Sequence, residues 1–435
     1  MSSRVSKSIW VSALTALCAL LLPTAAHAYI GPGAGFALVS SFLTLMIAFF
    51  TAFFALLTFP VRALARAWRR RRSLGRAKVK KTILLGIDGL DPDICERMMA
   101  AGELPNLSRL SETGSFRRLG TSTPALSPVA WSTFATGADS SRHAMYDFLS
   151  RDRRSYLPKL SSSEVYGSQR FWRLGPWRLP RGKSGVRMLR KGRTFWRVLS
   201  DHGVFCSVLR VPITFPVERI NGVMIAGMCV PDLRGTMGSF TYFTTSSEAD
   251  RIGGLIVKLS RPGTNGGWIE TEIPGPDSPI TGKTLTLPLT LRPDTQRGHL
   301  EMRLQGAVHT VRADAYTPWI RLSFKASPGV TLHGIARFRA THIDGDVGLY
   351  MTPIHIDPEK PAMPITHPSV FSIYLAKLMG PYGTLGLAED TWAMNERVIE
   401  ERAWLDQAWD FHAERERMWF HTLDRLRDGM ATIVF

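Results

Sequence analysis

Two long apolar runs lie near the start of the chain. The first spans Ile9–Leu22, follows Arg4 and Lys7, and leads into small residues up to Ala28, the order typical of a secretory signal peptide. The second spans Phe36–Phe59 without a charged residue and would extend about 36 Å as a helix, enough to cross a bilayer. We therefore expect a membrane-anchored protein.

A basic segment follows the second run. Residues 61–81 contain ten Lys and Arg and no acidic residue, and such clusters stay on the cytoplasmic side of most membranes. We expect the large domain to be cytoplasmic at a membrane of the bacterial inner type, with an extracytoplasmic location as the alternative. Cleavage after Ala28 would leave one span, whereas no cleavage would leave a hairpin, and both place the domain on the same side.

The first predicted strand ends at an acidic residue. Thr82–Ile87 is a short, β-branched apolar run typical of a buried parallel strand, and Asp88 follows it. Ligands of open α/β sheets bind beyond the carboxyl ends of the strands, so Asp88 is placed as a metal ligand or else as a helix cap. Asp91, before Pro92, is the better cap of the two.

A second candidate residue starts a predicted helix. Residues 127–137 read SPVAWSTFATG, with Ser127 as the expected cap, Pro128 in the first turn and Gly137 as the terminator. A hydroxyl at a helix amino terminus lies beside free N–H groups that favour a developing alkoxide or a bound phosphate. A capping serine with no further role explains the pattern equally well.

The rest of the chain alternates between patterns. Residues 151–193 are basic and aromatic and predict an irregular excursion, which could be a substrate lid, a membrane-facing loop or a solvated face. Residues 238–340 show period-two alternation between Gly and Pro turns, which predicts antiparallel strands. Residues 396–428 predict a long amphipathic helix, and an apolar strand follows at 430–435.

Composition and charge narrow the functional classes. The formal net charge is +18, but it is concentrated in residues 61–81 and 151–193, and the remainder is slightly acidic. The basic juxtamembrane run is better suited to anionic lipid headgroups than to nucleic acid. The four cysteines form neither a disulfide scaffold nor a zinc-finger pattern. The segment around His342, Asp344 and His355 could contribute metal ligands, although a strand-end turn explains it as well.

These motifs together resemble the type I phosphodiesterase/nucleotide pyrophosphatase branch of the alkaline phosphatase superfamily. The resemblance rests on the strand before Asp88, a Leu-Pro-Asn-Leu segment at 104–107, the stretch 127–137 and the segment after His143. It implies a central, mostly parallel sheet flanked by helices. It also implies that Asp88 binds a divalent metal, usually zinc, and that Ser127 is the metal-bound nucleophile, where Thr is more usual. The resemblance implies that His143 is not a metal ligand.

The resemblance implies hydrolysis of a phosphomonoester or phosphodiester whose identity the sequence does not give. In such enzymes a two-metal site activates the nucleophile and the hydrolytic water. The family strand that corresponds to residues 430–435 leads into an Asp and a His of that site, which are not in this sequence. Three interpretations stay open: a truncated product, an enzyme completed by a second chain, or a non-catalytic pseudoenzyme that acts as a membrane-associated binding or scaffold protein.

The expected organisation has six parts. They are a signal peptide or first hydrophobic segment (1–28), a transmembrane helix (34–60), a basic juxtamembrane segment (61–81), the first part of the α/β domain (82–237), a β-rich insertion (238–340) and the returning, truncated part of the α/β domain (341–435).

Overall fold

The computed structural model describes residues 78–435 except 167–170, 176, 181–184, 248–252, 262–266, 279 and 328–329, together with scattered positions from 49 to 75. The chain divides into two units, Met1–Trp68 and Arg69–Phe435, each described by itself. In the first unit the described positions, all between 49 and 68, are helical. No helix within the described residues is long and apolar enough to cross a membrane. The predicted segments 1–28 and 34–60 lie entirely or largely outside those residues.

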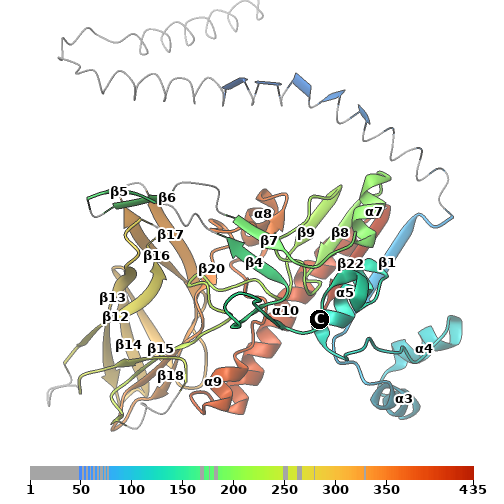
Figure 1. The fold of residues 1–435 in the computed structure, drawn as a ribbon. Helices are drawn as coiled ribbons and strands as arrows, with labels where there is room; N and C mark the ends of the chain where they lie inside the picture. Colours follow the sequence, from blue (N-terminus) through green and yellow to red (C-terminus); the bar gives the residue numbers. More distant parts are fainter. Residues whose placement is uncertain are drawn as a thin grey trace, which may run out of the picture. The chain divides into compact units, whose positions relative to one another are not determined.

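A five-stranded, mostly parallel sheet forms the centre of the second unit (Figure 1). Its first four strands are parallel, and the last is an antiparallel edge. In spatial order they are β1 (Lys81–Gly86), β22 (Gly429–Val434), β8 (Cys206–Leu209), β9 (Gly222–Ile225) and β21 (Thr366–His367). The final apolar strand, predicted at 430–435, therefore lies between β1 and β8 in the centre of the parallel sheet.

Helices cover both faces of this sheet. On one face α8 (Val370–Met379) and α10 (Glu401–Arg425) pack through Leu375 and Met418 against Ile433. On the other face, α5 (Ser127–Thr136) and α7 (Phe195–Asp201) pack against the alternate residues of β8 and β22. This three-layer arrangement is the α/β architecture that the resemblance implies.

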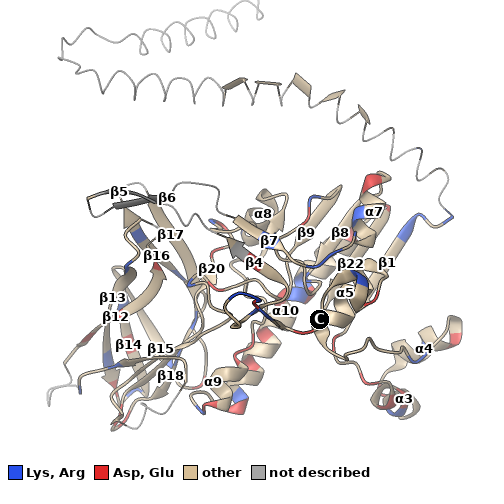
Figure 2. Ribbon diagram, viewed as in Figure 1, with Lys and Arg blue, Asp and Glu red and all other residues tan. Residues whose placement is uncertain are grey.

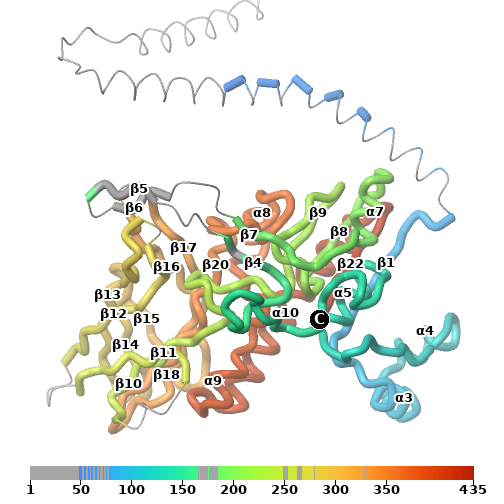
Figure 3. The backbone as a smooth tube through the Cα atoms, viewed as in Figure 1, coloured from blue at the N-terminus to red at the C-terminus, as the bar shows by residue number. Residues whose placement is uncertain are grey.

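Strand β1 is at the edge of the sheet and is not the buried strand that its sequence predicts. Ile83, Leu85 and Ile87 are about half exposed. From β1 the chain continues through α3 (Pro92–Ala100) and α4 (Pro105–Thr113) to α5 and the short helix α6 (Ser140–His143), a path that Figure 3 follows. Asp91 caps α3, as expected, by accepting hydrogen bonds from the N–H groups of Asp93 and Ile94.

The basic region 151–193 is not irregular where the structure describes it. It contains short antiparallel strand pairs. The pairs are β2 (Leu149–Arg151) with β3 (Pro158–Leu160), β4 (Ser163–Tyr166) with β7 (Gly185–Met188), and β5 (Phe171–Leu174) with β6 (Trp177–Pro180).

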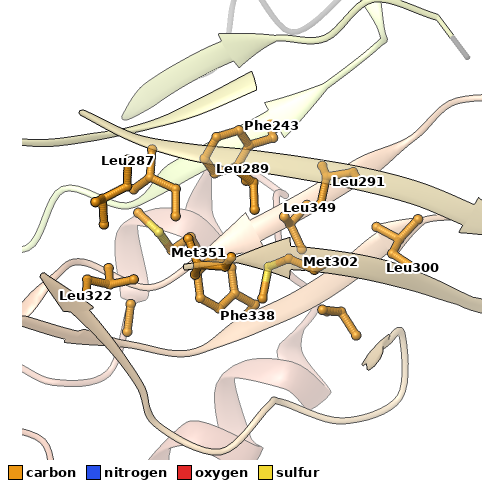
Figure 4. Close-up of a cluster of buried hydrophobic side chains, with 14 of the residues drawn as sticks. Phe243, Leu287, Leu289, Leu291, Leu300, Met302, Leu322, Phe338, Leu349 and Met351 are labelled. Atoms are coloured by element: carbon orange, nitrogen blue, oxygen red, sulfur yellow. The ribbon is translucent and has the colours of Figure 1, made fainter. Parts of the chain in front are cut away.

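Between β9 and β21 the chain leaves the central sheet and forms three smaller sheets. Their shared core includes Phe243, Leu289, Leu322 and Phe338, all almost fully buried (Figure 4). The first sheet contains β11 (Leu255–Lys258), β10 (Thr241–Thr244), β19 (Gly348–Met351) and β18 (Phe338–His342). The second contains β12 (Ile269–Asp277), β13 (Thr284–Asp294), β14 (His299–Leu304) and β15 (Ala307–Arg312). The third contains β16 (Ile320–Ser327), β17 (Val330–Ala336) and β20 (His355–Ile356).

The pairs within these sheets are antiparallel, as the alternating pattern predicts, except that β10 and β11 are parallel. After β21 and α8, the short helix α9 (Thr391–Asn395) precedes α10. The predicted amphipathic helix at 396–428 is confirmed as α10, although it begins five residues later.

Candidate active site

Asp88 lies just beyond the carboxyl end of β1. Its backbone N–H donates to the carbonyl oxygen of Phe435 at 3.1 Å, and the N–H of Phe435 donates to the oxygen of Gly86 at 3.0 Å. These bonds continue the β1–β22 ladder by one step and fix the backbone from which Asp88 projects. Its carboxylate is exposed, at the edge of the sheet where α/β proteins bind ligands.

Ser127 is the first residue of α5, and it is not the helix cap that the sequence predicts. Leu126 occupies the cap position, and it makes no side-chain capping bond. The Ser127 hydroxyl instead donates to Oδ2 of Asp88 at 3.3 Å. The two residues singled out in the sequence therefore meet, and the half-buried hydroxyl is not engaged with the first turn of its own helix.

A glycine allows α5 to pack close to β1. A Cβ atom at Gly86 would lie 2.7 Å from Cη2 of Trp131, which is nearer than such atoms approach in proteins. Trp131 is on α5, one turn after Ser127, so the missing side chain at Gly86 lets the helix approach the strand. Sequence reasoning gave neither residue a role, although a glycine that ends an apolar strand is a signal of close packing.

His143 is a buried residue that joins α6 to α5. Its Nε2 lies 3.1 Å from Oγ1 of Thr133, and its Nδ1 accepts the N–H of Met145 at 3.1 Å. Because Nδ1 accepts, Nε2 carries the proton and donates to Thr133. Burial and, secondarily, the charge of Arg190 lower the pKa of His143, which favours this neutral form. The arrangement is that of a structural histidine.

A cavity of about 170 Å³ opens beside Asp88 at the carboxyl edge of the sheet. It is enclosed by the ends of β22, the segments after β8 and β9, and α10. Five charged side chains line it: Asp88, Arg210, Glu389, Glu414 and Arg415. Apart from Asp88, sequence reasoning missed them because they are distributed among three distant segments.

Arg210 is the buried cation of this cavity. It follows β8 with a left-handed backbone, φ 53°, an unusual conformation for a residue with a side chain. Its Nη1 donates to the carbonyl oxygen of Ala226 at 3.3 Å and its Nη2 to that of Gly383, whereas its buried Nε has no partner among the described residues. Burial lowers the pKa of Arg210 to about 10, so the guanidinium still carries its charge near neutral pH.

The neighbouring acids are already engaged with protein groups. Glu414 accepts the indole N–H of Trp319 at 3.0 Å and the N–H of Gly383 at 2.8 Å, and burial raises its pKa. Glu389 lies 3.8 Å from Arg415. The Asp88 carboxylate is therefore the exposed acid of this cavity, and the buried Arg210 guanidinium supplies positive charge to its wall.

The described residues by themselves do not complete a metal site. Asp88 and Ser127 supply two oxygen donors, whereas catalytic zinc typically has three protein ligands. No group of three or more His, Cys, Asp or Glu within the described part of the chain could hold a metal ion. His342 is on β18 and His355 is fully buried on β20, in two different sheets, so the segment 342–357 does not form one ligand cluster.

Comparison with known proteins agrees with the sequence motifs. Residues 82–262 match the family model described as type I phosphodiesterase / nucleotide pyrophosphatase. No curated protein and no solved structure matched the chain. The matched range includes Asp88, Ser127 and Arg210. The match confirms the predicted resemblance to this family over residues 82–262.

Proposed function

We propose that this protein is a membrane-anchored phosphohydrolase in which Ser127 is the nucleophile and Asp88 binds a divalent metal, with zinc as the ion expected from the family. The family supports phosphoester hydrolysis in general. The observation that carries the assignment to these residues is the 3.3 Å contact between Ser127 Oγ and Asp88 Oδ2 at the carboxyl edge of the sheet.

The chain's own residues suggest how a phosphoester would react. Ser127 Oγ forms a bond to phosphorus and its proton passes to the Asp88 carboxylate that faces it. The ester oxygen leaves with its electron pair and takes up that proton, which restores the carboxylate. Water then cleaves the phosphoserine and restores the hydroxyl. Arg210 lines the same cavity as Asp88, and its buried guanidinium is positively charged. This charge would attract the phosphoryl oxygens of a bound substrate.

A metal would lower the pKa of the attacking hydroxyl and screen the phosphoryl charge. The family is metal-dependent in general. Asp88 and Ser127 are the donors that this chain offers within its described residues, and a second chain that adds donors is part of the proposal. Two oxygen donors do not by themselves define the geometry of a metal site.

The test is hydrolysis of bis(p-nitrophenyl) phosphate and p-nitrophenyl phosphate by the full chain in detergent. The protein is first stripped with a chelator and then reloaded with zinc, manganese or magnesium. We expect metal-dependent turnover that Ser127→Ala and Asp88→Asn abolish. Ser132→Ala is the matched control, because it removes a buried hydroxyl of the same helix that has no hydrogen-bond partner among the described residues. A folded protein without turnover or bound metal would favour the scaffold alternative.

We also propose that residues 34–60 anchor the chain and that the basic segment 61–81 contacts anionic lipid headgroups with the domain on the cytoplasmic side. The support is the uncharged apolar run and the ten basic residues after it. A reporter fused after Lys81 tests the topology. Reporter activity typical of the periplasm would overturn the cytoplasmic assignment.

A further inference from the structure

Helix α8 presents an apolar surface to solvent. Its exposed positions are 370, 373, 374, 377 and 378, and of these only Lys377 is charged. We call the other four the α8 stripe: Val370, Ile373, Tyr374 and Leu378, with exposed fractions of 63, 37, 44 and 48%. A surface helix normally turns its polar side outward, so four neighbouring apolar residues indicate a contact surface.

The α8 stripe continues into a groove of about 530 Å³. Val370 and Tyr374 line the groove on one side, and Phe205 and Leu426 contribute further apolar surface. Arg425 and Arg427 line the same groove and are exposed. The groove therefore combines apolar side chains with two exposed arginines, and Asp428 also lines it.

The groove is at the amino-terminal edge of the central sheet, where α8 begins with Val370. Lys81 is paired with Gly429, and Met430 with Cys206, so the groove residues Phe205 and Arg427 lie just before the starts of β8 and β22. The chain enters the sheet at the same edge, because the N–H of Gly429 donates to the carbonyl oxygen of Lys80 at 2.8 Å. Figure 2 shows basic residues at the start of β1.

The chain that reaches this edge is the basic segment after the apolar run. Residues 61–80 can extend roughly 70 Å at most, so an anchored membrane lies within reach of the amino-terminal edge. A short tether of this kind raises the effective concentration of the bilayer at that edge. Exposed Lys80, Lys81, Arg425 and Arg427 match the charge of an anionic leaflet.

We propose that the α8 stripe and its groove dock on the surface of an anionic lipid bilayer. The apolar side chains enter the headgroup region and the basic residues contact the phosphates, as in other interfacial helices. The proposal rests on the membrane anchoring proposed above. Asp88 and Ser127 are at the opposite end of the parallel strands from the groove, about 20 Å away for a strand of six residues, so docking through the groove leaves the catalytic edge open to soluble substrates.

The experiment places an environment-sensitive fluorophore on the full chain in lipid vesicles. Cys95, Cys206 and Cys229 are buried, so after Cys18→Ser an introduced Ile373→Cys takes the label selectively. Val308→Cys is the matched control, because Val308 is 62% exposed but lies on β15, in another sheet. Vesicles contain phosphatidylcholine with or without phosphatidylglycerol, and a doxyl-labelled lipid acts as quencher.

We expect the label at position 373 to be quenched about twofold or more above the label at position 308, and more strongly with phosphatidylglycerol. Val370→Glu with Leu378→Glu, both at exposed positions, should remove the difference without affecting the fold. Equal quenching at positions 373 and 308 would overturn the docking proposal. A blue shift that grows with protein concentration but shows no lipid quenching would also overturn it, since that result assigns the surface to a second copy.

Flotation separates docking from anchoring. Flotation that resists alkaline carbonate reports the anchor, whereas quenching at position 373 reports the docked surface. Resistant flotation with an unquenched label overturns docking alone. A chain that does not float with vesicles overturns both proposals.

Discussion

The hydroxyl of Ser127 donates to the carboxylate of Asp88 across 39 positions of sequence. Two local features make this contact. The pairing of β1 with β22 fixes the backbone at Asp88, and the absence of a side chain at Gly86 lets Trp131 and its helix approach the strand. The site therefore depends on the packing of α5 as much as on the two residues that form it.

Replacing Ser127 by threonine should retain activity, whereas alanine should remove it. Threonine keeps the hydroxyl that contacts Asp88, and the family resemblance implies threonine at this position in most members. We expect Ser127→Thr to remain within about tenfold of the natural rate and Ser127→Ala to fall about a thousandfold or more. Steady-state hydrolysis of bis(p-nitrophenyl) phosphate measures both. Equal rates for the alanine variant and the natural protein would exclude Ser127 as nucleophile.

Gly86→Ala should impair catalysis by displacing α5. The added Cβ would lie 2.7 Å from Trp131 and 3.0 Å from Val434, so the helix has to move outward and Ser127 with it. A displacement of about 1 Å can cost up to about a hundredfold in rate. The measured quantity is kcat/KM, with Gly120→Ala as the control because no atom lies within 4 Å of its added Cβ. The double variant Gly86→Ala with Trp131→Phe has a smaller ring at this contact and should regain part of the lost activity. No recovery in the double variant would contradict this packing argument.

Arg210→Gln should weaken the binding of inorganic phosphate. A charge-assisted hydrogen bond contributes about 1.5–3 kcal/mol, so we expect the inhibition constant of phosphate to rise about tenfold or more. Arg402→Gln serves as the control, because that side chain is 80% exposed and pairs with Asp406 on α10. Calorimetric titration with phosphate gives the same comparison without turnover. An unchanged constant in the Arg210 variant would show that this guanidinium does not face the phosphoryl group.

Asp390 should give the protein a measurable pH dependence of stability. Burial raises its pKa to about 6, while it accepts the hydroxyl of Tyr350 at 2.6 Å and the N–H of Ala393 at 2.9 Å. A raised pKa means that the folded state holds the proton more tightly. The stabilisation is therefore present at low pH and is lost as the pH rises through about 4 to 6.

Asp390→Asn keeps a hydrogen-bond acceptor but does not titrate. Relative to the natural protein, the variant should gain about 2 kcal/mol in the free energy of unfolding between pH 4 and pH 7. Urea unfolding of both proteins across this range measures the difference. Parallel stability curves would show that Asp390 does not titrate in this range.

Much of the local structure follows from short-range pattern. The apolar run before Asp88, the capping residue Asp91, the helix after Ser127 and the alternating strands beyond residue 238 all occur where the sequence predicts them. These features depend on side-chain periodicity and on residues that stabilise helix ends, which act over a few positions of chain.

Other predictions from the sequence were wrong at positions whose environment depends on residues far away in the chain. Ser127 is not a cap, because Leu126 takes that position and the hydroxyl contacts Asp88 instead. The apolar sequence of β1 predicts a buried strand, but β1 is a half-exposed edge strand. The exposure of a strand depends on which other elements cover it. The sequence around Arg210 did not indicate a functional residue. Its burial results from α10 and the loop at Gly383, which close over the end of β8.

The sequence by itself determined the resemblance to the type I phosphodiesterase / nucleotide pyrophosphatase family, the two candidate catalytic residues and the apolar and basic segments near the start of the chain. These are properties of residue type and spacing along the chain. Only the tertiary structure decided that Ser127 meets Asp88, that Arg210 joins Asp88 in one cavity, and that the groove beside α8 lies at the edge where the basic segment enters. Such relations arise from strand order and helix packing, which bring together residues that local sequence does not connect.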